Sequence, residues 1–206
     1  MKVRSFQGMT PVLGDKVFVD ETALVLGDVR IGNDSSIWPL TVVRGDVNKI
    51  RIGNNTNIQD NSVLHVTHPH GDVPEGYTVS VGDNVTVGHR VILHGCEIGD
   101  NCLIGMGSTV MDGAVIEPYV LLGAGSLVSP GKVLEGGFLW LGSPVRKVRP
   151  LSDDERKWIR ASAEHYVELK NRHLDEEAKL TSQSSCRRVL SGRCRNTTMY
   201  RNNSVG

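Results

Sequence analysis

The sequence predicts an all-β protein: a parallel β-helix of hexapeptide repeats that forms a triangular prism, followed by one C-terminal α-helix. The main observation is a period of six in the apolar residues. That period fits neither an amphipathic helix nor an alternating strand, and it is typical of a hexapeptide β-helix. Composition agrees, because the chain has 23 glycines and only 5% aromatic residues. Glycine suits tight corners between short aliphatic strands.

The repeat is carried by Val, Ile and Leu anchors that point into the prism. Each hexad supplies one short strand and a corner, and three hexads form one coil of about 18 residues. We expect about five coils to stack, each burying the apolar edge of the one before. Small residues after the anchors allow the tight corners. The anchors are Val19, Val25, Ile31, Ile37, Val43, Ile52, Ile58, Leu64, Val81, Val87, Leu93, Ile98, Ile104, Val110, Ile116, Leu122 and Val128.

Two departures from the period divide the chain. Residues 66–78, VTHPHGDVPEGYT, interrupt it with Pro, Gly and charges, which indicates a loop extruded from a coil. Long loops in compact domains are often functional. After the repeat, Ser152 and Glu155 form a capping-box pattern that predicts a helix outside the prism. We therefore expect a β-helix domain over 1–150, a helix over 151–180 and a disordered basic tail over 181–206.

Charge and composition exclude several classes of protein. The formal net charge is zero, so nothing global indicates nucleic acid or a membrane surface as a partner. The tail holds five arginines and no acid, and an anionic partner for it is the less favoured interpretation. No apolar leader begins the chain, and no run approaches the roughly 20 apolar residues of a membrane helix. We expect a cytoplasmic protein whose cysteines are thiols.

Three of the seven histidines, His65, His89 and His94, lie within the repeat. His65 and His94 each follow an anchor on neighbouring layers, whereas a corner separates His89 from His94. A single histidine in a strand is usually structural. These three cannot easily converge within one prism, but they could meet across a face shared by two subunits. Three imidazoles with an open fourth position are the zinc pattern of hydrolytic and hydration sites.

The spacing H-x23-H-x4-H, together with VVRGDVNKIRIGNNTNIQDNSVLH, resembles the γ-class carbonic anhydrase family over about residues 10–175. The likeness is close to its bacterial YrdA-type members. It implies a left-handed coil and a homotrimer with metal sites at the subunit interfaces. His65 and His94 would bind from one subunit and His89 from its neighbour. The implied activity is that of a zinc-dependent lyase: reversible hydration of CO2 to bicarbonate by metal-bound hydroxide. Fe2+ and Co2+ are alternative metals.

Four polar residues interrupt the apolar pattern: Arg44 and Asp46 in VRGD, and Gln59 and Asp60 in IQD. From the residues alone, they could form an ordinary solvated face. The resemblance implies that Arg44 reaches Asp60 of a neighbouring subunit and holds the interface. It also places Asp46 and Gln59 near the metal-bound water. Gln59, Asp46 and Arg44 are therefore the catalytic candidates, with Gln59 positioning hydroxide or bicarbonate.

The chain departs from the family's archetype at Val47, which follows Asp46 where the archetype has a proton-shuttling glutamate. His68 and His70 in the loop are either substitute proton relays or merely exposed. Cys96 is expected to be a buried thiol and not a ligand.

Two alternatives to a hydratase stay open. Hexapeptide prisms also host acyltransferases, which use one histidine as a general base. The other alternative is a non-catalytic scaffold in which the metal only holds the trimer together.

Overall fold

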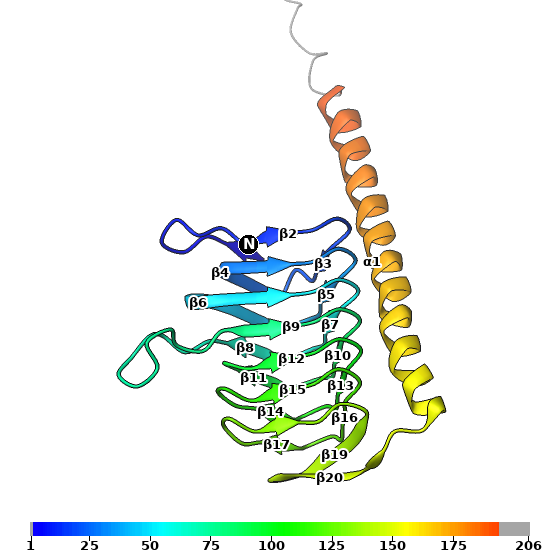
Figure 1. The fold of residues 1–206 in the computed structure, drawn as a ribbon. Helices are drawn as coiled ribbons and strands as arrows, with labels where there is room; N and C mark the ends of the chain where they lie inside the picture. Colours follow the sequence, from blue (N-terminus) through cyan, green and yellow to red (C-terminus); the bar gives the residue numbers. More distant parts are fainter. Residues whose placement is uncertain (1, 194–206) are drawn as a thin grey trace, which may run out of the picture.

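The computed structural model describes residues 2–193 and has the expected architecture. Short strands wind into stacked coils with three faces, and one long helix lies along the outside (Figure 1). A parallel β-helix with a C-terminal helix is therefore confirmed. Within residues 2–193, no helix is long and apolar enough to cross a membrane.

The first and second faces share one 12-stranded sheet because two long strands run across both. These strands are β4 (Leu24–Ile31) and β6 (Val42–Ile52), and the chain bends at the corner within them. The first face also contains β1 (Val3–Arg4), β8 (Val63–His65), β11 (Ile92–His94), β14 (Thr109–Val110) and β17 (Leu127–Val128). The second face also contains β2 (Val12–Leu13), β9 (Val79–Val81), β12 (Glu97–Ile98), β15 (Val115–Ile116) and β18 (Val133–Leu134).

The third face is an eight-stranded sheet that is parallel except for its last pair. In spatial order it contains β3 (Phe18–Val19), β5 (Ser36–Ile37), β7 (Asn57–Ile58), β10 (Thr86–Val87), β13 (Leu103–Ile104), β16 (Leu121–Leu122), β19 (Phe138–Gly142) and β20 (Val145–Pro150). β20 turns back antiparallel to β19, so it closes this end of the stack.

The predicted anchors form the core, since all of them are buried. The number of coils is larger than the expected five, because the third face alone has seven parallel strands. The period of six continues beyond the anchors counted from the sequence, to Leu13 at one end and to Leu134 and Trp140 at the other. Leu13 is the register partner of Ile31, and Trp140 is that of Leu122.

A ladder of Asn and Asp side chains ties one row of corners together. Asn54 Oδ1 accepts the backbone N–H of Asn33 at 2.8 Å, and Asp83 Oδ1 accepts that of Asn54 at 2.6 Å. Asp100 Oδ1 continues the ladder by accepting the N–H of Asp83 at 2.8 Å. Asn and Asp serve alike here, because each offers a side-chain oxygen that satisfies a corner N–H.

The helix α1 (Asp153–Arg193) begins with the predicted capping box. Ser152 Oγ accepts the N–H of Glu155 at 3.2 Å. The Glu155 carboxylate in turn accepts the backbone N–H of Ser152 at 2.9 Å. Its end differs from the expectation, because the helix continues past residue 180 to Arg193. Residues 181–191 contain neither Gly nor Pro, so nothing there stops a helix. The part of the expected disordered tail up to residue 193 is therefore helical, and residues 194–206 lie outside the described residues.

The helix covers the third face through apolar and aromatic contacts. Ile159 and Ala163 are fully buried, and Ile159 forms a cluster with Leu103 and Leu151. Trp38, on the same face, meets the ring of Tyr166 edge-on at 5.5 Å. Lys170 is also completely buried, and its ammonium binds Asp34 at 2.8 Å. The helix thus seals one face of the prism with residues of the same chain.

Candidate metal centre

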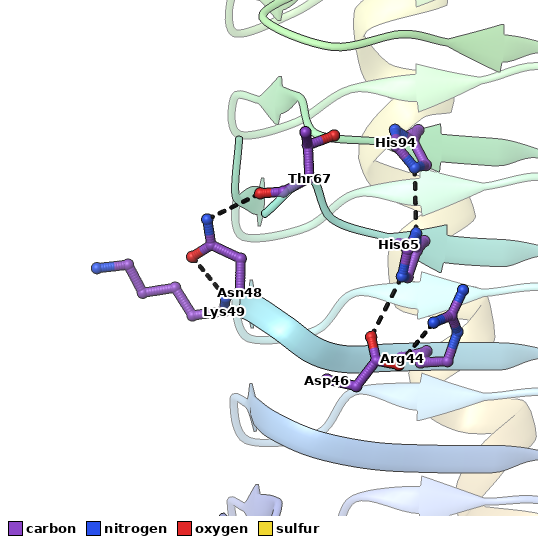
Figure 2. Close-up of polar contacts among 7 residues, drawn as sticks. All are labelled: Arg44, Asp46, Asn48, Lys49, His65, Thr67 and His94. Carbon is purple, nitrogen blue, oxygen red and sulfur yellow. Dashed lines mark hydrogen bonds and ion pairs between the residues drawn. The ribbon is translucent and has the colours of Figure 1, made fainter. Parts of the chain in front are cut away.

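His65 and His94 lie side by side at one corner of the prism (Figure 2). They end β8 and β11 and are direct register partners. Each follows a buried anchor, so the alternation of a strand turns its side chain outward. His65 Nδ1 and His94 Nε2 face each other at 3.1 Å, although residues 66–78 separate the two strands in the sequence.

Two carboxylates hold the far sides of these rings. Asp46 Oδ1 lies 3.2 Å from His65 Nε2, and Asp112 Oδ1 lies 2.6 Å from His94 Nδ1. A carboxylate only accepts, so the ring hydrogens are placed on His65 Nε2 and His94 Nδ1. The two nitrogens left with lone pairs are then the pair that face each other at 3.1 Å. Facing lone pairs repel unless a cation or a proton lies between them.

The separation also fits a metal. Two nitrogen ligands at 2.0–2.1 Å from a tetrahedral zinc are roughly 3.3 Å apart, close to the observed 3.1 Å. The arrangement of carboxylate, histidine and metal recurs in metal sites, where the carboxylate fixes the ring and its tautomer. His65 and His94 therefore fit a divalent metal as two of its ligands.

The surroundings of His65 favour its neutral form, which is the form that binds a metal. Burial lowers the pKa of His65, and the nearby Arg44 guanidinium lowers it further, although Asp46 acts in the opposite direction. Burial raises the pKa of Asp46, but hydrogen bonds from Arg44 and His65 outweigh it, so that pKa lies below its usual range. Arg44 Nη1 binds Asp46 Oδ2 at 2.6 Å. Asp46 is thus an ionised acceptor, and His65 is the neutral donor to it.

His89 lies at the opposite edge of the first face, at the corner between β10 and β11. Its side chain is 46% exposed, and Asp60 Oδ2 lies 2.9 Å from its Nδ1. By the same logic, Asp60 leaves His89 Nε2 free to bind a metal. Within residues 2–193 of one chain, no group of three metal-binding side chains converges. One chain therefore offers two histidines at one edge and a third at the other.

The remaining predicted residues have other partners within the chain. Arg44 pairs with Asp46 and Asp60 pairs with His89, so the Arg44–Asp60 contact between subunits stays a prediction. Gln59 is buried, and its amide donates to Asn57 Oδ1 at 3.1 Å. The roles of Gln59, Asp46 and Arg44 in catalysis likewise stay predictions.

A groove of about 460 Å³ lies between the third face and α1, and His89 is one of the residues that line it. Gln59, Met106, Trp158 and Tyr166 are among the residues that line it. Its walls are mostly aliphatic and aromatic. Burial, followed by the charge of Asp60, raises the pKa of Tyr166. The phenol is therefore neutral.

Three other candidates from the sequence do not join the histidine pair. His68 and His70 are exposed in the loop, and His70 Nδ1 contacts the carbonyl of His68 at 2.9 Å. Cys96 is buried, and burial raises the pKa of its thiol far above its usual value. A thiol in that state is a poor ligand.

Sequence reasoning missed Asp112. Its signal is its spacing: Asp112 is 18 residues after His94, which is one coil. A search for carboxylates one coil away from each histidine would have found it.

Comparisons with known proteins identify the family of this chain. The model of the family described as bacterial transferase hexapeptide (six repeats) matches residues 78–111 and 95–130. The chain is 51% identical to protein YrdA of Escherichia coli K12, over 84% of this chain and 95% of that protein. It is 43% identical to mitochondrial gamma carbonic anhydrase 2 of Arabidopsis thaliana, over 88% of this chain and 65% of that protein.

A solved hexapeptide transferase family protein from Anaplasma phagocytophilum is 41% identical, with a TM-score of 0.76. The match covers 82% of this chain and 96% of that one. The histidine spacing, the coil architecture and these relatives agree. The chain belongs to the hexapeptide-repeat family of γ-class carbonic anhydrase-like proteins.

Proposed function

We propose that the protein is a metal-dependent carbonic anhydrase-like lyase that reversibly hydrates CO2 to bicarbonate and a proton. The observation that carries the proposal is the pair of imidazole nitrogens 3.1 Å apart whose ring hydrogens are committed to Asp46 and Asp112. Such a pair has the spacing and the free lone pairs to bind a cation. Its relatives named as gamma carbonic anhydrases support the choice of reaction.

The third ligand in this proposal comes from another copy of the chain. His89 and the His65–His94 pair lie at opposite edges of the first face, so one edge of a chain can meet the other edge of its neighbour. Contacts of this kind form a ring when the rotation between copies closes. The resemblance to the γ-class family implies that this ring is a homotrimer. Each interface would then bring His89 to the pair, with a fourth position open.

When bound, a divalent metal lowers the pKa of water to about 7 and so makes hydroxide available at neutral pH. Zinc is our choice, with Fe2+ and Co2+ as alternatives, because imidazole suits all three. The histidines hold it, and their carboxylates fix which ring nitrogens are free. Asp46, held by Arg44, accepts the hydrogen of His65. Gln59 lies beside His89 in the groove and would orient the substrate oxygen.

Mixed trimers test the shared site. His89→Ala and His94→Ala each break every site when expressed alone. Co-assembled, each mixed trimer regains one native site, where the intact pair of one chain meets the intact His89 of the next. We expect metal content and CO2 hydration to be absent in the two variants and to return in the mixture. No return on mixing would contradict a site shared between subunits.

The groove beside His89 favours one second candidate, an acyltransferase that places the apolar acyl group of its donor there. One solved relative carries a transferase name, and the groove is much larger than CO2 requires. Thermal-shift measurements separate the two functions. Stabilisation by coenzyme A derivatives with no effect of chelators would favour acyl transfer, and the reverse would favour the hydratase.

A scaffold whose metal only joins the subunits makes a different prediction. Chelation would then dissociate the trimer, as in the hydratase, because each metal would bridge two chains. The metal-replete protein, however, would not accelerate hydration of CO2. The hydration rate of protein with a full complement of metal therefore decides between these two.

A further inference from the structure

Asp112 contacts His94 from the next coil of the prism. Its Oδ1 accepts from His94 Nδ1 at 2.6 Å, which is the shortest of the three histidine–carboxylate contacts described above. Its Oδ2 accepts from the Thr67 hydroxyl at 3.0 Å. Both oxygens are therefore used, and the carboxylate plane is fixed between a candidate ligand and a residue of the extruded loop.

The backbone leaves room for this carboxylate. Gly95, directly after His94, has φ of +56°, and a Cβ there would collide with Asp112 Oδ1. Gly113, directly after Asp112, has φ of +68° and donates its N–H to the carbonyl of Gly95 at 2.7 Å. Glycine adopts such angles more readily than other residues, and at Gly95 it also leaves the space that Asp112 Oδ1 occupies. The two corners thus bring Asp112 against His94 at a fixed distance.

The position of Thr67 at the base of the loop is also fixed by hydrogen bonds. Thr67 and Tyr77 exchange two backbone hydrogen bonds, at 2.9 and 3.0 Å, which close the neck of the loop. Asn48 Nδ2 donates to the carbonyl of Thr67 at 3.1 Å (Figure 2). It also donates to the carbonyl of Glu75 at 2.8 Å. The Thr67 hydroxyl therefore reaches Asp112 from a well-defined position.

We infer that Asp112 is a positioning residue, which fixes the tautomer and orientation of His94 for a metal and ties the base of loop 66–78 to the metal centre through Thr67. The inference rests on the proposed role of His94 as a ligand. It is independent of the reaction, because it concerns metal affinity and not CO2. Outer partners of metal-bound histidines typically contribute about 10–100-fold to metal affinity.

The test compares metal affinity, measured by competition with a chelator for Zn2+ and for Co2+, in four assembled variants. Asp112→Asn keeps the shape but removes the charge, and we expect affinity to fall by about 10–100-fold. Thr67→Val removes only the hydroxyl that orients Asp112, so a loss of a few-fold is expected. Asp100→Asn is the matched control, since asparagine already serves at two other positions of that corner ladder. His94→Ala shows what loss of a ligand does.

The outcomes separate the inference from the proposed function. Affinity of Asp112→Asn within twofold of the parent protein, with affinity lost in His94→Ala, would overturn the role of Asp112 alone. Unchanged affinity in His94→Ala would overturn the ligand assignment and so the proposed function. A fall in thermal stability of Asp112→Asn without a change in affinity would mark it as merely structural. If Asp112→Asn does not assemble, unchanged affinity in Thr67→Val overturns the inference.

Discussion

The first and third faces of the prism differ in what covers them. The third face is sealed by α1, where Ile159, Ala163 and Lys170 are completely buried. The first face has no such cover in residues 2–193, and its outward-facing side chains Val63 and Ile92 are 38% and 43% exposed. The two candidate half-sites lie at the edges of this uncovered face. One face is thus covered within the chain, and the other is the face on which the proposed trimer would place a second copy.

The largest expected effect comes from the ligands at the edges of the first face. His65→Ala should weaken binding of Zn2+ by more than about 100-fold, above the range for outer partners, because it removes a direct ligand. Metal content of the purified trimer and chelator competition measure this. His165→Ala, an exposed histidine on α1, is the control and should bind normally. Normal metal content in His65→Ala would show that the first face does not contribute to the metal site.

The next effect comes from a residue of the first face that is not itself a ligand, Ile92, which lies two residues before His94 in β11. Ile92→Glu should disrupt the trimer by repulsion between like charges, and metal affinity should then fall to that of His89→Ala. Val133→Glu places the same charge on the second face, at a side chain that is already 55% exposed, and should change neither property. Sedimentation and metal analysis report both. A trimer that survives Ile92→Glu with metal bound would show that another face joins the subunits.

A smaller effect is expected on the third face, and only on stability. Lys170→Ala removes the buried ammonium that binds Asp34 and should lower the free energy of unfolding by about 2 kcal/mol. This value is below the usual range for breaking a buried ion pair, because the Asp34 side chain is about one-third exposed. Lys170→Met keeps the packing of the stem and should lose less. Urea unfolding measures this, and a change in metal affinity would contradict the separation of the two faces.

The smallest effect is at the start of α1. Hydrogen bonds with Arg149 and the N–H of Ser152 lower the pKa of Glu155 from 4.5 to about 2. The charged form is therefore the stabilising one. The stabilisation that the charged Glu155 gives to the folded protein is complete above pH 4.5 and is lost as the pH falls toward 2. Glu155→Gln should lower Tm by about 1–3 °C at neutral pH. The difference from the parent protein should shrink in acid, and a difference that grows in acid would contradict this sign.

Much of the fold could be predicted because a period of six has few structural solutions. The anchors, the capping box and the β-helix were predicted from spacing alone and are confirmed. The number of coils was wrong, because the period was not followed to Leu134 and Trp140. The end of the helix was also wrong, because a polar, basic composition does not by itself stop a helix.

The candidate site was predictable in part. The three histidines were found from their spacing, and their role as ligands stays a prediction. Asp112 was missed, because it belongs to no motif and is near His94 only across the coil spacing. The pairing of Asp60 with His89 within the chain was also missed, since it depends on side-chain torsions that no spacing determines.

The sequence by itself determined which side chains point into the prism, which point outward and which lie one layer apart. It could do so because the hexad fixes the geometry of each strand and corner. Only the tertiary structure decided that His65 and His94 are register partners at 3.1 Å, since the loop 66–78 obscures their true separation. It also decided the tautomers, because Asp46 and Asp112 approach these rings from the coils on either side. A hydrogen bond depends on atoms of neighbouring layers, and their positions are fixed only when the coils stack.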